Sequence, residues 1–326
     1  SHLGSGDVFV VEADESDGSF LQYPTRIAII TNIEPDHLDN WGTARAYADG
    51  FRRFATGQTV QAVVINVDDA GARALAEEPR AGATRVVGYG ESADAEVRLT
   101  DLDFEGTHAS ATLLAEDRSF PFRLRVPGRY NLANAAAAFA AGRLLELDAE
   151  RLVAGAGEFT GTLRRFQLVA EQRLNPDDPA DRAVRIYDDY AHHPTELRAA
   201  LTAALRAKGG GRLVACFQPH LYSRTRDFAD EFGAALCLAD VVLVTDIYAA
   251  REDPLPGVTG ALVADAAHRH ASPGTSVEYV PDKGSLAAHL AGLVQPGDLV
   301  MTLGAGDVTL VGPMLAGLLA QRAGGR

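Results

Sequence analysis

The 326-residue chain is 47% hydrophobic and carries a net charge of −14, from 44 acidic and 30 basic residues. A field of this sign repels polyphosphate backbones, and the paired arginines are too short a run to offset it, so we expect no nucleic-acid partner. Neither a secretory leader nor an apolar run of 18 residues occurs, so we expect no membrane insertion. Two cysteines, Cys216 and Cys237, lie in apolar stretches, which is typical of buried thiols in a reducing cytoplasm.

The first half of the chain alternates predicted strands and helices. Apolar runs at residues 7–12 and 27–33 predict two strands that end in polar residues, as at the carboxyl edge of an open parallel sheet. Residues 44–54 form an amphipathic helical pattern, and residues 62–67 predict a third buried strand. Shorter alternating stretches in residues 84–126 predict a small antiparallel sheet, an embellishment on the main one. Helices are then predicted at residues 132–145 and 148–155.

Residues 157–162 contain turn formers without periodicity, which places a domain boundary near residue 160. We therefore predict two α/β domains, residues 1–160 and 161–326. The second domain repeats the alternation and is predicted to be doubly wound and Rossmann-like. Its strands are expected at 183–188, 212–217, 241–245, 277–280 and 299–303, and its helices at 194–208, 223–238, 258–270, 284–293 and 307–321.

Acidic residues cluster where the first two strands are predicted to end. Four carboxylates lie within residues 12–17, and residues 32–37 add further oxygen donors and an imidazole. An acidic turn exposed to solvent would explain the first cluster alone, because four carboxylates cannot all be buried without a cation. Two such clusters at neighbouring strand ends favour a site for a hard metal such as Mg²⁺.

Three further motifs lie near predicted strand or helix ends. Asn131 is placed to cap the helix that follows Gly128, which leaves Asn134 without a structural explanation. The pair Arg164–Arg165 opens the second domain and could be an ordinary surface pair. Residues 188–196 read DDYAHHPTE at a strand-to-helix junction, where open α/β sheets bind ligands.

The next strand is followed by QPHLYSRTRD at residues 218–227. Ser223 could be a helix N-cap, and Arg224 would lie in the first helical turn, where a cation opposes the helix dipole. This unfavourable placement indicates a ligand-binding role. Asp246, Tyr248 and the glycine-containing loop 304–307 lie at two more strand ends, and the glycines would let the backbone approach a ligand closely.

The string EADESDGSF at residues 12–20, followed by TNIEPDHLD at 31–39, resembles paired motifs of the Mur ligase family. Together with DDYAHHPTE, the resemblance is to the members that join L-alanine to UDP-N-acetylmuramate. It implies that Glu12 and His37 hold Mg²⁺ beside the phosphates of ATP, with Asp36 assisting. No lysine precedes Lys208, so the carbamylated lysine of some relatives is absent.

The same resemblance assigns nucleotide and substrate contacts. An asparagine that matches Asn134 hydrogen-bonds adenine in the family, an arginine that matches Arg165 reaches the nucleotide, and Asp189 would bind its ribose. Many relatives have an arginine where this chain has Leu221, which puts one substrate contact in doubt. The amino acid and the muramoyl carboxylate would meet Tyr190, His192, His220 and Arg224, with His192 a candidate base.

The family's phosphate-binding string G-x-x-G-K-T/S does not occur in this sequence, and neither lysine follows a glycine. We therefore expect a fragment that lacks the N-terminal UDP-binding domain and the P-loop, and that is inactive as a ligase by itself. Two alternatives remain open. One is the ligase that recycles a murein tripeptide, although its acidic motif has tyrosine where this chain has Ser16. The other is a non-catalytic binding module of the same fold.

Overall fold

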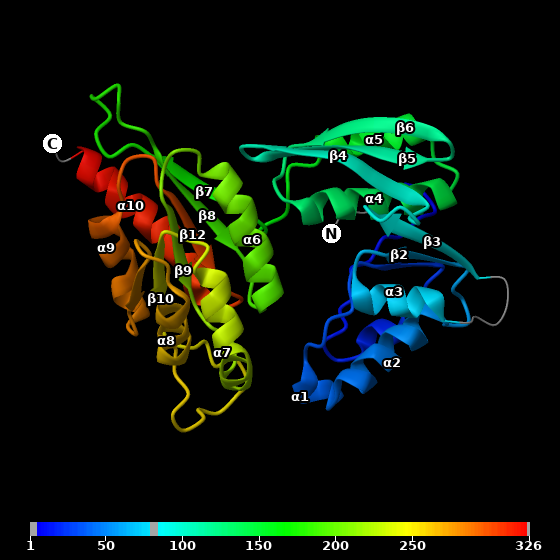
Figure 1. Cartoon of the computed structure of the whole chain (residues 1–326), viewed down its shortest axis with the longest axis horizontal. Helices are drawn as coiled ribbons and strands as arrows, with labels where there is room; N and C mark the ends of the chain where they lie inside the picture. Colours follow the sequence, from blue (N-terminus) through cyan, green and yellow to red (C-terminus); the bar gives the residue numbers. More distant parts are fainter. Residues whose placement is uncertain (1–4, 79–83, 325–326) are drawn as a thin grey trace. The chain divides into compact units, whose positions relative to one another are not determined.

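The structure is a computed structural model that describes residues 5–78 and 84–324. The chain forms two compact units (Figure 1). Unit 1 contains residues 1–101, 111–122 and 132–156, and unit 2 contains residues 102–110, 123–131 and 157–326. Each unit contains α/β layers, which confirms the predicted fold class.

A six-stranded sheet in the order β1-β2-β3-β4-β5-β6 forms the first half of the fold. Strands β1 to β4 pair in parallel. The segment predicted to be antiparallel continues this same sheet as β4 to β6. Two-residue connections join β4 to β5 and β5 to β6, and Glu116 and Asp117 in the second have positive φ, as a tight hairpin turn requires. The strands are β1 Ile27–Ile30, β2 Ala62–Asn66, β3 Arg85–Gly90, β4 Val97–Glu105, β5 His108–Ala115 and β6 Arg118–Leu124.

The strand predicted at residues 7–12 is wrong. These residues form no regular secondary structure and pair with no strand among the described residues, and Phe9 and Val10 are 84% and 85% exposed. Apolar composition predicted burial, but a strand also needs a neighbour that pairs with its backbone groups, and the described sheet begins at β1.

Helices cover the first sheet, and the predicted helix at 44–54 is confirmed as α2. Thr43 caps it by accepting a hydrogen bond from the Ala46 N–H at 3.1 Å. Asn131 is not the predicted N-cap, because α4 already begins at Arg129. Its side chain instead donates to the Pro127 carbonyl at 2.7 Å. The helices are η1 Ser19–Gln22, α1 Leu38–Trp41, α2 Ala44–Ala55, α3 Ala70–Glu77, α4 Arg129–Leu144 and α5 Ala149–Glu158.

The second sheet has the order β11-β10-β9-β12-β8-β7 and confirms the doubly wound prediction. All its neighbours pair in parallel except β7, an antiparallel edge strand that was not predicted. Its strands are β7 Gln167–Gln172, β8 Val184–Asp189, β9 Leu213–Phe217, β10 Val241–Val244, β11 Ser276–Tyr279 and β12 Leu299–Leu303.

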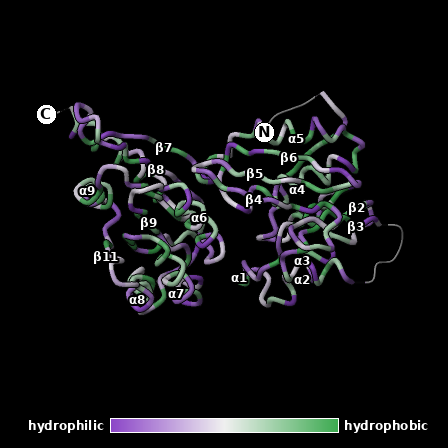
Figure 2. The backbone as a smooth tube through the Cα atoms, turned by 45° about the horizontal axis from the view of Figure 1, so that its top comes forward, coloured by the Kyte–Doolittle hydropathy of each residue, from purple (hydrophilic) through white to green (hydrophobic). Residues whose placement is uncertain are grey.

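Alternate residues of β9 face two separate apolar cores, so this strand is apolar throughout (Figure 2). Leu213 and Phe217 of β9 pack with α6, α7 and α8, whereas Val214 and Cys216 pack with α9 and α10. The helices are α6 Pro194–Ala207, α7 Tyr222–Leu236, α8 Ala261–His270, α9 Lys283–Leu293, η2 Asp307–Leu310 and α10 Val311–Gly324. No helix of the described residues combines the length and apolar character that a membrane crossing requires.

Two helical glycines should respond to alanine in opposite directions. A Cβ on Gly233 in α7 would lie 2.5 Å from the backbone nitrogen of Ala267 in α8, whereas a Cβ on Gly317 in α10 meets nothing within 4 Å. We expect Gly233→Ala to lower the free energy of unfolding by about 1–3 kcal/mol through overpacking. We expect Gly317→Ala to raise it by about 0.5–1 kcal/mol, because alanine is the better helix former. Urea unfolding of both variants checks this, and equal signs would contradict the packing described here.

Candidate active site

The candidate site lies at the carboxyl edge of the second sheet. The parallel strands β8, β12, β9 and β10 are neighbours, so the loops that follow them emerge at one edge. The chain runs across the sheet from β8 through β9 and β10 to β11, and then returns to place β12 between β8 and β9. Such a reversal of strand order marks the position where open α/β sheets bind ligands. The structure therefore brings together the two histidine-containing motifs, which follow β8 and β9.

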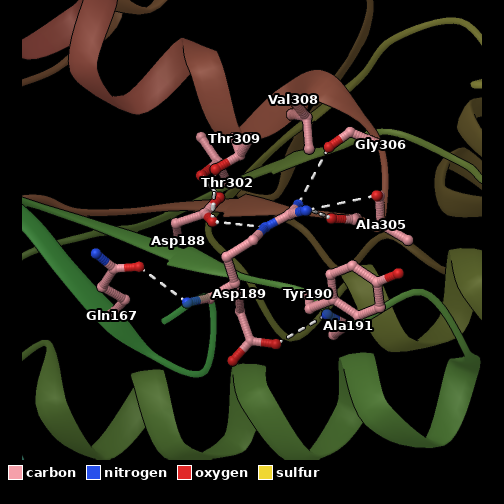
Figure 3. Close-up of polar contacts among 12 residues, drawn as sticks. Gln167, Asp188, Asp189, Tyr190, Ala191, Thr302, Ala305, Gly306, Val308 and Thr309 are labelled. Carbon is pink, nitrogen blue, oxygen red and sulfur yellow. Dashed lines mark hydrogen bonds and ion pairs between the residues drawn. The ribbon is translucent and has the colours of Figure 1, made fainter. Parts of the chain in front are cut away.

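Arg164 connects the end of β8 to the loop that follows β12. Its guanidinium donates to the carboxylate of Asp188 at 3.1 Å, and to the carbonyls of Gly304 at 2.6 Å and Gly306 at 3.2 Å (Figure 3). Asp188 is only 2% exposed, and it also accepts hydrogen bonds from the hydroxyls of Thr302 at 2.6 Å and Thr309 at 2.8 Å. Sequence reasoning missed Arg164 because it favoured the adjacent Arg165. The available signal was the second aspartate at the strand end, which needed a cation when buried.

The glycines of the 304–307 loop allow side chains and backbone of the protein itself, rather than a ligand, to approach the loop closely. A Cβ on Gly306 would lie 2.4 Å from the side-chain oxygen of Gln218 and 2.6 Å from the ring of Tyr248. The amide of Gln218 accepts the Val308 N–H at 3.1 Å and donates to Asp307 at 3.0 Å. The close approach expected at this loop is therefore made by Gln218 and Tyr248, which join the β9, β10 and β12 loops.

Asp189 is buried and holds the chain that enters the second domain. Its two oxygens accept the backbone N–H groups of Phe166 at 2.8 Å and Ala191 at 2.9 Å. Burial raises the pKa of Asp189 to about 6, although these two N–H groups and nearby Arg165 oppose the shift. Arg165 lies 5.7 Å from the ring of Tyr190 and 3.6 Å from Glu196. The predicted nucleotide contacts of Asp189 and Arg165 stay predictions.

Four aromatic rings from the loops that follow β8, β9 and β10 lie close together. The centroids of Tyr190 and His192 are 5.1 Å apart, and those of His192 and His220 are 5.7 Å apart. His220 stacks on Tyr248 at 5.8 Å, and Arg164 lies 4.8 Å above the ring of Tyr190. The predicted residues Tyr190, His192 and His220 therefore form one cluster, and the structure adds Tyr248 to it.

The predicted cation of the site, Arg224, is 6% exposed in the first turn of α7. Ser223 is not the N-cap, because α7 begins at Tyr222; its backbone N–H donates to Glu252 at 2.9 Å, and its hydroxyl donates to the same carboxylate. Leu221 is buried, with φ of 66°, and its N–H donates to the Tyr248 carbonyl at 3.0 Å. An apolar side chain thus occupies the position where an arginine contact was in doubt.

His220 should make stability depend on pH. Burial lowers the pKa of His220 to about 4, and nearby His192, Arg224 and Arg251 add to the shift. Because its pKa is lower in the folded chain than the usual 6.5, the unfolded chain binds more protons between these values, and stability rises with pH from about 4 to 6.5.

We therefore compare the wild-type chain with His220→Gln, which does not titrate. One pKa unit corresponds to about 1.4 kcal/mol, and partial exposure of the ring reduces the effect. Between pH 6.5 and 4 we expect the wild type to lose about 1–3 kcal/mol more than the variant. The raised pKa of Asp189 acts in the opposite direction in both proteins, so it cancels in the difference. If urea unfolding gives the wild type and His220→Gln the same dependence of stability on pH, the lowered pKa of His220 is contradicted.

In the acidic clusters of the first domain, the carboxylates nearest to His37 are those of Glu15 and Asp36, whereas the predicted metal ligand was Glu12. The imidazole Nε2 lies 3.8 Å from Glu15 and 3.6 Å from Asp36, and Nδ1 is buried without a hydrogen-bond partner among the described residues. Glu12 is exposed, and no described contact joins it to His37. Asn134 is exposed on α4.

The donors near His37 suit a hard cation in kind but do not enclose one. Two carboxylates and an imidazole are suitable ligands, yet no group of three or more His, Cys, Asp or Glu side chains within residues 5–78 and 84–324 is arranged to hold a metal. A magnesium ion would therefore complete its shell with phosphate oxygens and water, as Mg²⁺ usually does. The pair Glu12 and His37 stays a prediction.

The fold and the strand-end clusters define the class of protein. Residues 4–142 match the Mur ligase middle domain, and residues 164–306 match the glutamate ligase domain of Mur ligases. The chain belongs to the Mur ligase family. It is 61% identical over 325 residues to UDP-N-acetylmuramate–L-alanine ligase of Cutibacterium acnes, covering 99% of this chain and 66% of that protein.

Further relatives agree with this assignment. The chain is 50% identical over 320 residues to the ligase of the same name from Kineococcus radiotolerans, covering 98% of this chain and 65% of that one. Among solved structures, UDP-N-acetylmuramate–alanine ligase from Thermotoga maritima superposes with a TM-score of 0.71 at 25% identity, covering 93% of this chain and 61% of that chain. The chain spans just under two thirds of the length of these curated relatives.

Proposed function

We propose that the chain is the ATP-handling and amino-acid-binding part of a ligase that joins L-alanine to UDP-N-acetylmuramate in peptidoglycan synthesis. The observation that carries the proposal is the convergence of Tyr190, His192, His220 and Arg224 at the switch point of the second sheet. The relatives of this name support it, because their identity extends over nearly the whole chain. Two free cysteines and nucleotide substrates favour a cytoplasmic site of action in cell-wall growth, cell shape and division.

We assign the two halves different tasks. Residues 1–160 bind ATP, with Asn134 on the adenine, and residues 161–326 bind the amino acid, with Arg165 and Asp189 reaching the nucleotide. Glu12 and His37 are the proposed Mg²⁺ ligands, and the Glu15 and Asp36 carboxylates near His37 supply further negative charge. When bound, Mg²⁺ offsets the negative charge of the phosphates during transfer.

The proposed chemistry has two steps. The muramoyl carboxylate oxygen attacks the γ-phosphorus of ATP, which gives an acyl phosphate and ADP. The neutral amine of L-alanine then attacks the acyl carbon, and inorganic phosphate leaves with the former carboxylate oxygen. In this scheme Arg224 binds a substrate carboxylate, His192 accepts the amine proton, and His220, neutral at physiological pH, adds no second positive charge beside the amine.

Competition between amino-acid substrates tests the proposal on the product of the complete open reading frame. With ATP and UDP-N-acetylmuramate, we expect amide formation with L-alanine and a preference for it over murein tripeptide in a mixture. Preference for the tripeptide would assign the recycling reaction, and no amide from either would indicate a binding module. The 326-residue chain alone should give no turnover, because its sequence contains no G-x-x-G-K-T/S string.

A further inference from the structure

Glu196 contacts both the backbone and the imidazole of the same histidine. Its carboxylate accepts the backbone N–H groups of His192 at 3.0 Å and His193 at 3.2 Å. The same oxygen, Oε2, lies 3.3 Å from Nδ1 of the His192 ring. The sequence placed Glu196 in the DDYAHHPTE string without giving it a task, and helix capping alone explains only its contacts to the backbone.

The surroundings of the ring determine where its proton lies. Nδ1 of His192 is also 3.0 Å from the carbonyl oxygen of Tyr190. A carbonyl and a carboxylate can only accept, so a ring nitrogen that faces both must carry hydrogen. In the neutral ring the lone pair is then on Nε2, and this nitrogen is the one that can accept a proton.

The Glu196 carboxylate lies against the His192 ring. Its Oε2 is 3.3 Å from Nδ1, and Arg165 lies 3.6 Å from the other carboxylate oxygen. Burial raises the pKa of Glu196, but His192, the two backbone N–H groups and Arg165 outweigh it, and the net shift is downward. The rings of Tyr190 and the neutral His220 also lie near His192, and the positive charges of Arg224 and Arg251 act on His220. Glu196 is thus an ionised group placed to stabilise an imidazolium.

We propose that Glu196 is a positioning residue that fixes His192 with hydrogen on Nδ1 and strengthens its affinity for a proton at Nε2. The arrangement resembles a carboxylate that orients a catalytic histidine, here contributed by the next helical turn. The effect of Glu196 on the His192 ring can be measured in this chain by itself. Its consequence for catalysis rests on the proposed function, in which His192 is the base.

Nuclear magnetic resonance of the ¹⁵N-labelled chain tests the effect on the ring. We compare the wild type with Glu196→Gln, whose amide oxygen can still cap α6 but carries no charge, and assign the His192 signals from a His192→Gln spectrum. We expect Nδ1–H in the neutral wild-type ring, and a pKa of His192 lower by about one unit in Glu196→Gln. Glu278→Gln is the control, because Glu278 lies 2.6 Å from Nε2 of His289 and should alter that ring only.

Two results would overturn the proposal. One is hydrogen on Nε2 in the neutral wild-type ring. The other is an unchanged pKa of His192 in Glu196→Gln while Glu278→Gln shifts His289, because a purely structural cap predicts that pattern. Circular dichroism of each variant shows whether α6 and its domain remain folded.

The pH dependence of kcat in the complete gene product tests the consequence for catalysis. A base must be deprotonated to act, so kcat falls at low pH as His192 becomes protonated. In Glu196→Gln we expect this fall in kcat to move to lower pH by the same amount as the pKa of His192 measured by nuclear magnetic resonance. If the pKa of the ring shifts but the fall in kcat does not, His192 is not the base, and the proposed function fails at that step while the positioning of His192 stands. If neither moves, the positioning itself is refuted.

Discussion

His192→Gln in the complete gene product should lower kcat for amide formation by about 10²- to 10⁴-fold, the usual contribution of a general base. The ring lies at the switch point of the second sheet, between Tyr190 and His220. Glutamine preserves polarity and approximate size but cannot accept a proton at neutral pH. The KM for L-alanine should change much less than kcat, because the substrate carboxylate is assigned to Arg224.

His289→Gln serves as the control for this measurement. His289 is also paired with a carboxylate, that of Glu278 at 2.6 Å, but it lies on α9, which packs on one face of the sheet, and no described contact joins His289 to Tyr190, His192 or His220. We expect its kcat to equal that of the wild type. A His192→Gln enzyme with wild-type kcat would remove His192 from the chemistry.

Asp188→Ala should lower the free energy of unfolding by about 3–5 kcal/mol. The carboxylate is 2% exposed and accepts hydrogen bonds from Arg164, Thr302 and Thr309. Removing it takes one acceptor from a guanidinium and from each of two hydroxyls inside the fold, and each lost hydrogen bond at a buried group costs free energy. Urea unfolding followed by circular dichroism measures the loss.

Asp230→Ala is the matched control for this loss. Asp230 pairs with Arg269 at 2.9 Å and with His270 at 3.1 Å, but its side chain is 61% exposed. Exposed ion pairs contribute little, so we expect a change of about 0–1 kcal/mol. Equal losses in the two variants would contradict the view that the Arg164–Asp188 pair organises the loops of the site.

The fold could be predicted where one physical signal dominated. Strands β9 and β12 are buried on both faces, so they appear in the sequence as short runs, apolar except for Thr302, between helical patterns. The histidine motifs were predictable for a related reason, since polar residues that directly follow such a strand must lie at its carboxyl edge. The resemblance to the Mur ligase family then assigned His192 and His220 to one substrate site before any distance was known.

The remaining features depended on tertiary partners that sequence patterns do not encode. Residues 7–12 have a buried strand's composition, yet no described strand pairs with them. Arg164 and Arg165 are adjacent and chemically identical, and only the fold shows that Arg164 reaches Asp188 and the 304–306 carbonyls. Glu196 likewise had no assigned role in the sequence motif until its distance to the His192 ring was known.

Isotope transfer tests the central claim, that this chain belongs to a ligase that activates a carboxylate as an acyl phosphate. The complete gene product is supplied with ATP, L-alanine and UDP-N-acetylmuramate labelled with ¹⁸O in the muramoyl carboxylate. Because the carboxylate oxygen leaves with the phosphate, we predict one ¹⁸O atom in each inorganic phosphate released, as read by mass spectrometry. Amide product formed with unlabelled phosphate would contradict the account.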